Sequence, residues 1–179
     1  MIKSLQDIYL LEDSKQFDKA FGAYSEFYLK YKSDYEVWKH FYFFLWTAIE
    51  DAPSSFHDEI NLRSLLKRMF DEGKKSFSDK ADFNFIAGYT VSIFPYEYGD
   101  YDDLSKEGEQ MLLQATILDP DNIIYKMAYL GSISNPDQII YRQTEVKAAV
   151  KVLETFSGPG TLNNYFKQVL YRHDKRAYR

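Results

Sequence analysis

The sequence predicts an all-α protein. In most segments of the chain, apolar residues recur at the i, i+3, i+4, i+7 spacing of one buried helical face. Clusters of Pro, Gly and Ser separate these segments, as expected for turns between helices. No stretch alternates β-branched and polar residues over a useful length, so we expect no strand.

The first half of the chain predicts two helix pairs, at about 2–31 and 34–77. Ser33 or Asp34 can cap the first helix of the second pair, and Pro53-Ser54-Ser55 interrupts that pair. The helical spacing is carried by Phe17, Ala20, Phe21, Tyr24, Phe27, Tyr28 and Tyr31, by Tyr35, Trp38, Phe41, Tyr42, Leu45 and Ile49, and by Leu62, Leu65, Leu66, Met69, Phe70 and Phe77.

The second half predicts pairs at 80–118 and 121–156 and a closing helix at 161–172. Pro95, Pro120 and Asn135-Pro136 mark helix ends, and Gly158-Pro159-Gly160 turns the chain into the last helix. With 179 residues, the chain is expected to form a single domain at 1–179. No hairpin can bury its apolar face alone, so neighbouring pairs must stack and a polar last helix must cap them.

This pattern resembles the tetratricopeptide repeat, a family of stacked helical hairpins that hold other proteins. Ala20 and Tyr24 stand at its second-helix positions and Trp38 at its large first-helix position. Phe27, where the family has a small residue, departs from the pattern, as does an insertion at 52–57. Around the third pair the resemblance is carried by Gly108, Ala115, Leu118, Asp119 and Pro120, and around the fourth by Leu130-Gly131.

The resemblance implies a groove lined by the inner faces of the first helices. These faces would carry Glu36, Lys39, Phe43 and Trp46, then Asp82, Phe85, Tyr89 and Ser92, then Tyr125 and Ala128. Such a mixture of aromatic anchors and charges could recognise a protein surface. Alternatively, Phe43, Trp46 and Phe85 belong to the core.

The charge pattern favours a basic partner. The net charge is −5, and residues 1–120 carry 22 acidic and 13 basic side chains, so the body of the protein is acidic. Such a body repels phosphates, so we expect no nucleic-acid partner. The imbalance can also serve solubility alone. Aromatic residues make up 18% of the chain, a fraction that suits both a core and an interface.

Composition also bears on where the protein works. The absence of cysteine excludes disulfides and thiol nucleophiles and suits a reducing cytoplasm. Asp7 interrupts the first apolar residues, so we expect no signal peptide. The longest apolar run, 41–49, is far shorter than a membrane span of about 20 residues. We therefore expect a cytoplasmic protein without a membrane partner.

No catalytic motif is recognisable. His40, His57 and His173 lack a second histidine at metal-ligand spacing, so we predict no metal and no cofactor. His57-Asp58-Glu59 is the densest titratable cluster, but consecutive helical residues point in different directions, which favours a solvated helix start. The chain lacks a phosphate-binding glycine loop and a nucleophile elbow. An enzyme would need groups that only the fold brings together.

Residues 96–103 concentrate carboxylates and tyrosines in eight positions. Carboxylates pair with Lys or Arg while tyrosines pack around them, so this segment is a candidate contact for a basic protein. Alternatively, it is a helix start rich in acids for dipole reasons. We predict partner contacts at Tyr96, Glu97, Tyr98, Asp100, Tyr101, Asp102 and Asp103, and on the inner face at Glu36, Lys39, Trp46, Tyr89 and Tyr125.

These observations predict a non-catalytic protein-binding module. A compact acidic chain of this type resembles, in a general way, bacterial immunity proteins, which neutralise a toxin by covering its active site. That resemblance implies a tight complex with a folded basic toxin domain. The other possibility is an adaptor that holds an extended peptide in the groove.

Overall fold

The computed structural model describes residues 4–171, without the side chains of His57, Asp58 and Glu59. Its order is α1 (Leu5–Asp13), α2 (Phe17–Lys30), α3 (Tyr35–Asp51), α4 (Ser54–Glu59), α5 (Leu62–Phe77), α6 (Ala81–Ile93), the 3-10 helix η1 (Pro95–Glu97), α7 (Tyr101–Leu118), α8 (Ile123–Ser132), α9 (Gln138–Thr155) and α10 (Thr161–Leu170). Residues 4–171 contain no strand, so the predicted all-α class is confirmed. Within the same range, no helix is both long and apolar enough to cross a membrane.

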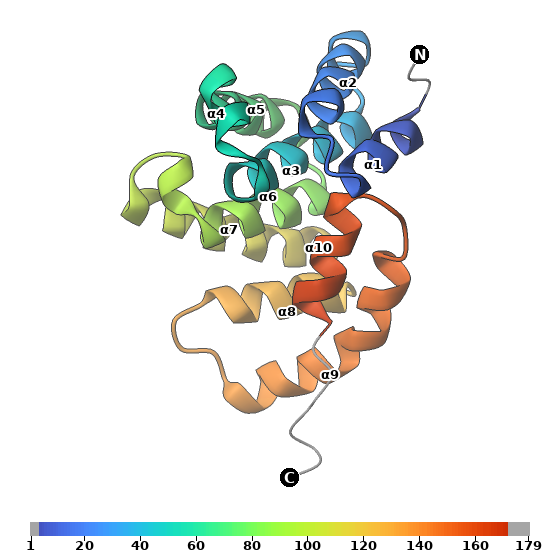
Figure 1. The fold of residues 1–179 in the computed structure, drawn as a ribbon. Coiled ribbons are helices and arrows are strands. Elements are labelled where there is room, and N and C mark those ends of the chain that lie inside the picture. Colours follow the sequence, from blue (N-terminus) through green and yellow to red (C-terminus); the bar gives the residue numbers. More distant parts are fainter. Residues whose placement is uncertain (1–3, 172–179) are drawn as a thin grey trace.

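Asp34, one of the two residues predicted to cap the 34–77 pair, is the N-cap of α3, and α8 and α9 begin with caps of the same kind. The side chain of Asp34 accepts hydrogen bonds from the backbone N–H groups of Glu36 and Val37, and Asn122 and Asp137 cap α8 and α9 in the same way. The helix α4 occupies the insertion between α3 and α5, the two long helices of the second pair (Figure 1).

The core is aromatic and centres on α3. Residues 37 and 38, and every residue from 40 to 48, are buried, so this helix is covered on all sides. The Trp38 ring stacks on Tyr42 with centroids 4.7 Å apart, and its Nε1–H donates to the carbonyl oxygen of Met69 at 2.9 Å. Many of the aromatic residues that the sequence offered for core or interface are thus core.

The third pair is held together by glycines. A Cβ on Gly88 of α6 would lie 2.9 Å from the Cβ of Met111, and a Cβ on Gly108 of α7 would lie 2.8 Å from the backbone nitrogen of Ser92. The two helices can approach this closely only because neither position has a side chain. Gly108 is the small residue that the repeat resemblance placed in the middle of this helix.

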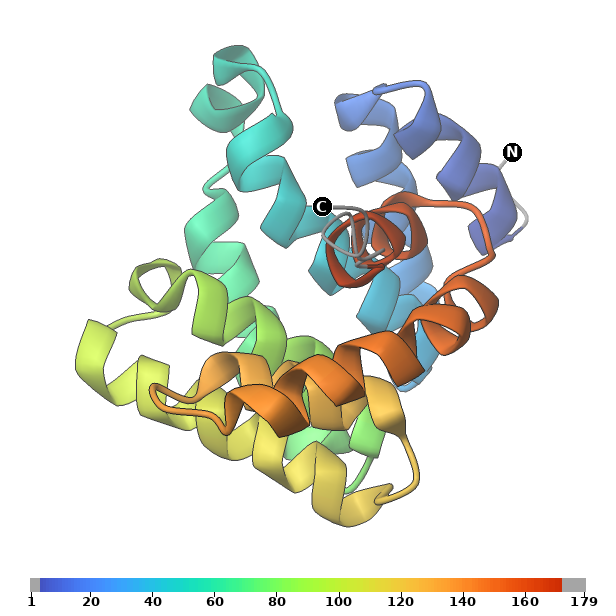
Figure 2. The same ribbon diagram turned by 90° about the horizontal axis from the view of Figure 1, so that it is seen from below.

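The last helix returns to the first. α10 contacts α9, α3 and α1, and Figure 2 shows it on the inner side of the arc that the other helices form. Of the expected closing helix 161–172, residue 172 lies outside the described residues, as do residues 2 and 3 of the first expected pair. Five apolar residues of α9 are exposed: Ile139, Ile140, Val146, Val150 and Leu153.

Candidate functional site

The segment 96–103 contains the end of η1 and the first turn of α7. Asp100 is the N-cap of α7, and its Oδ1 accepts hydrogen bonds from the backbone N–H groups of Asp102 at 3.1 Å and Asp103 at 3.2 Å. The acids in this first turn also suit the positive end of the helix dipole. The interpretation of this segment as an acid-rich helix start therefore agrees with the backbone structure. It does not explain why several side chains of the segment point into solvent.

Two of the predicted contact residues in this segment are buried, which corrects the expectation for them. The Glu97 side chain is 1% exposed and accepts hydrogen bonds from Arg63, from Nε and, at 3.1 Å, from Nη2. The Tyr98 hydroxyl shares a 2.6 Å hydrogen bond with that of Tyr42, which shares another with Thr90 Oγ1. Glu97 and Tyr98 hold η1 against the core and cannot reach a partner.

The remaining residues of the segment are exposed. Tyr96 and Tyr101 are 56% and 60% exposed, and Asp100, Asp102 and Asp103 are exposed as well. In the part of the chain that the structure describes, these three carboxylates have no Lys or Arg within ion-pair distance. We call this set of five residues the acidic edge: Tyr96, Asp100, Tyr101, Asp102 and Asp103.

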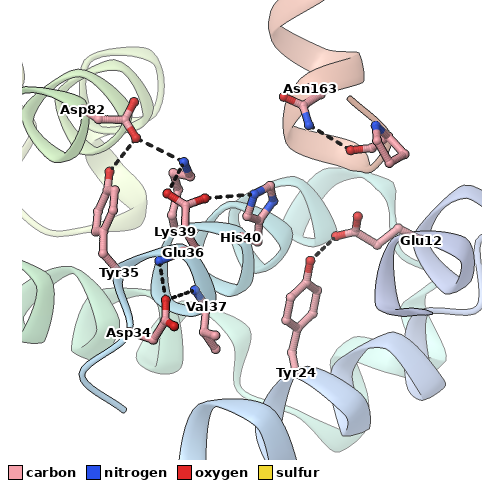
Figure 3. Close-up of polar contacts among 11 residues, drawn as sticks. Glu12, Tyr24, Asp34, Tyr35, Glu36, Val37, Lys39, His40, Asp82 and Asn163 are labelled. Atoms are coloured by element: carbon pink, nitrogen blue, oxygen red, sulfur yellow. Dashed lines mark hydrogen bonds and ion pairs between the residues drawn. The ribbon is translucent and has the colours of Figure 1, made fainter. Parts of the chain in front are cut away.

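The predicted inner faces of three first helices meet at Asp82. Its Oδ2 accepts hydrogen bonds from the Tyr35 hydroxyl at 2.9 Å and from Lys39 Nζ at 3.2 Å (Figure 3). Its Oδ1 accepts one from the Tyr125 hydroxyl at 3.4 Å. Lys39 Nζ also lies 2.9 Å from Glu36 Oε1. The structure therefore brings Glu36, Lys39 and Tyr125 together, from α3 and α8, around a carboxylate of α6.

These contacts are internal bonds between helices. Burial opposes the charged form of Lys39, but Asp82 and Glu36 outweigh it and raise the pKa of Lys39. Burial and Asp82 raise the pKa values of Tyr35 and Tyr125. Since Tyr125 is 9% exposed and Lys39 is already paired, only Glu36 of this group is exposed enough to contact a partner.

The aromatic part of the inner face is covered by α10. Tyr165 packs against Trp46 and Phe166 packs against Tyr89, with ring centroids 5.2 Å and 5.1 Å apart. Trp46 is 3% exposed and Tyr89 is half-buried. Trp46 is thus a core residue in this structure, which corrects its prediction as a free contact, and the expected groove is filled by the chain's own helix.

His40 is buried, and its imidazole is neutral at pH 7. His40 lies under the Tyr9 ring, with centroids 4.8 Å apart, and burial together with the charge of Lys39 lowers its pKa to about 3. His173 and the side chain of His57 lie outside the described residues, as do the side chains of Asp58 and Glu59. Among the described residues, no group of three or more His, Asp or Glu could hold a metal ion.

A cavity of about 220 Å³ lies between α6, α7, α8, α9 and α10. Its wall includes Ser92 and Ser132, whose hydroxyls donate to the backbone carbonyls of Tyr89 at 2.9 Å and Tyr129 at 2.8 Å. The carboxylate in its wall is that of Glu109, on α7.

Glu12 is a buried carboxylate that was not among the predicted site residues. This side chain follows Ile8 by one helical turn on the buried face of α1, and a carboxylate at an apolar position was the available signal. Its Oε1 accepts a hydrogen bond from the Tyr24 hydroxyl at 2.9 Å, and its Oε2 accepts one from the backbone N–H of Thr161 at 2.9 Å (Figure 3 shows the former). Burial raises the pKa of Glu12 to about 7.

With this geometry established, the chain was compared with known proteins. No protein-family model, no curated protein and no solved structure matches it.

Proposed function

We propose that this chain is a non-catalytic binding module that takes up a basic partner protein through the acidic edge. The observation that carries the proposal is the contrast between two sets of carboxylates. Asp82, Glu97 and Glu12 are tied to other helices, whereas Asp100, Asp102 and Asp103 are exposed beside two exposed tyrosines.

The acidic edge combines features of a protein interface. Its three carboxylates can steer a positively charged protein toward it and pair with Lys or Arg on contact. Tyr96 and Tyr101 bring large rings with few rotatable bonds, which suits them as anchors that become buried in the complex. The cap bonds of Asp100 fix the backbone that carries this set, so little conformational freedom is lost on binding.

The most specific form of the proposal is neutralisation. In that form the partner is a folded basic toxin domain, and the protein works by covering the toxin's active site, as immunity proteins do. The peptide-adaptor alternative receives less support, because in the state with α10 docked, Tyr165 and Phe166 fill the groove that an extended peptide would use.

The proposal is tested with a triple variant, Asp100→Asn, Asp102→Asn and Asp103→Asn. Asn retains an N-cap oxygen, so α7 should keep its start while the edge loses its charge. The tagged wild-type protein is used to capture its partner from the cells that express it naturally, and association with the purified partner is then measured at several salt concentrations. We expect about tenfold slower association by the variant and a weaker salt dependence.

A charge-matched control distinguishes the effect of the acidic edge from the effect of the protein's net charge. Asp18→Asn, Glu26→Gln and Asp121→Asn remove three exposed charges elsewhere on the chain and should leave association nearly unchanged. Equal rates for the wild type and the edge variant would remove the edge from the mechanism. For the neutralisation form, co-expression must restore growth to cells that produce the partner. A partner without toxicity would reject that form alone.

A further inference from the structure

The helix α10 has the pattern of a helical ligand laid on a surface. Its buried residues Leu162, Phe166 and Leu170 follow one another every four positions, while Asn164 and Gln168 are exposed on the other side. Its ten residues are too few to form a stable helix alone in water. Its structure therefore depends on the surface that it covers.

That surface is aromatic and comes from three different parts of the chain. Phe166 is fully buried and lies with its ring centroid 5.1 Å from Phe43 of α3 and 5.0 Å from Phe85 of α6. It also stacks on Phe156 at 5.0 Å, just after α9. We call the receiving surface the aromatic groove; it is formed by Phe43, Trp46, Phe85, Tyr89 and Phe156.

The aromatic groove contains a polar group that α10 leaves without a partner. Trp46 Nε1 is buried and has no hydrogen-bond acceptor among residues 4–171 as the structure describes them, although the Trp46 ring packs edge-on against Tyr165 at 5.2 Å. Trp38 offers a comparison within the same helix, because its Nε1 donates to the Met69 carbonyl. A buried donor without an acceptor is costly, so α10 complements this surface incompletely.

The attachment of α10 to the rest of the chain is slight at its first turn. The connection 157–160 contains two glycines, and Gly160 has a φ of +92°, a conformation that other residues rarely adopt. Two polar contacts hold the turn to α1: the Thr161 N–H with Glu12, and Asn164 Nδ2 with Asp13 Oδ1 at 3.3 Å. Burial raises the pKa of Glu12 to about 7. Above that pH the Glu12 carboxylate is charged while α10 is docked beside it, and the carboxylate would become better hydrated if α10 left.

We propose that the aromatic groove is a helix-binding site in which α10 is the built-in occupant, and that an amphipathic helix of a partner protein replaces it. The partner helix carries a large apolar or aromatic side chain at the position of Phe166 and apolar side chains four residues to either side. It also offers an oxygen acceptor to Trp46 Nε1. This site differs from the acidic edge and does not depend on it.

A disulfide lock tests whether α10 must leave. The chain has no cysteine, and the exposed side chains of Asp13 and Asn164 contact each other, so Asp13→Cys with Asn164→Cys introduces a single thiol pair. Formation of the disulfide is verified by mass and thiol titration before binding is measured, because the bond requires close Cβ atoms. The probe is a fluorescent synthetic peptide with the sequence of residues 160–171. We expect the reduced variant to bind the peptide and the oxidised variant to bind it at least about tenfold more weakly.

A second experiment transfers the anchor between the chain and the peptide. With Phe166→Ala in the full chain, the attached helix competes less well, so the wild-type peptide should bind at least about tenfold more tightly than it binds the wild-type chain. The same substitution in the peptide should reverse that gain. Gln168→Ala, at an exposed position of α10, is the matched control and should change neither affinity.

The outcomes separate the possible occupants. Equal peptide binding by the oxidised and reduced lock variants would overturn the proposal, because α10 would then not cover the site. A folded Phe166→Ala chain that binds no peptide would overturn it as well. So would a dimer that forms on reduction and excludes the peptide, since the occupant would then be α10 of a second copy.

Discussion

The carboxylate of Glu12 accepts a hydrogen bond from the backbone N–H of Thr161, with Oε2 and N 2.9 Å apart. This bond joins the first helix to the first residue of the last helix. The same carboxylate accepts a hydrogen bond from the Tyr24 hydroxyl, so one buried side chain links α1, α2 and α10. Its protonation state therefore affects how the two ends of the chain are held together.

We expect Glu12→Gln to change how stability depends on pH. Burial raises the pKa of Glu12 from 4.5 to about 7, so between these pH values the folded chain holds a proton that the unfolded chain has lost. This contribution to stability is present at low pH and declines as the pH approaches 7. The free energy of unfolding of Glu12→Gln, relative to wild type, should rise by about 3 kcal/mol from pH 4.5 to 7, measured by urea denaturation.

His40 should produce the opposite slope. Its pKa is lowered from 6.5 to about 3, so between these values the unfolded chain binds a proton that the folded chain does not, and stability rises with pH. The two effects oppose each other between pH 4.5 and 6.5, where the wild type should be nearly flat and Glu12→Gln should become more stable as the pH rises. A flat profile for both proteins over that interval would contradict this account of the two groups.

We expect Gly108→Ala to be destabilising by about 1–3 kcal/mol. The added Cβ would meet the backbone nitrogen of Ser92 at 2.8 Å, and backbone atoms cannot move aside as a side chain can. Gly22→Ala is the control, because nothing lies within 4 Å of its Cβ and alanine favours the helix. Thermal and urea unfolding of both variants should show changes of opposite sign. Equal effects would mean that α6 and α7 do not pack this closely.

The two tryptophans should respond differently to phenylalanine. Trp38→Phe removes a donor from the Met69 carbonyl, whereas Trp46→Phe removes a donor that has no acceptor. We therefore expect Trp38→Phe to cost about 1–2 kcal/mol more than Trp46→Phe in the free energy of unfolding. A larger cost for Trp46→Phe would show that its indole N–H is satisfied in solution.

The buried tyrosine pair provides a further test. Tyr42→Phe deprives the Tyr98 hydroxyl of its partner in a site that is closed to water, and should cost about 1–3 kcal/mol. The double variant with Tyr98→Phe should cost less than the sum of the two single variants, because it leaves neither hydroxyl without its partner. Additive costs in urea denaturation would mean that the two hydroxyls do not interact.

The sequence predicted the helices well because the 3.6-residue period and the capping residues are local signals. Gly108 was singled out by the repeat resemblance, which places a small residue in the middle of this helix, and the structure has α6 and α7 in close contact there. The segment 96–103 had no such period, and nothing local distinguishes buried Glu97 from exposed Asp102. Their difference depends on Arg63, which lies 34 residues before Glu97. Likewise, Trp46 could be assigned to core or surface only once α10 was located.

The position of α10 also bears on how the molecule unfolds. A row of stacked hairpins contacts only its neighbours, so it frays from its ends, and each end can open without the other. Here α10 contacts α1 and α3 as well as α9, so it joins the first helix of the array to the last long helix. Loss of α10 would leave α1 and α9 free to open separately, turning one all-or-none transition into a series of partial ones.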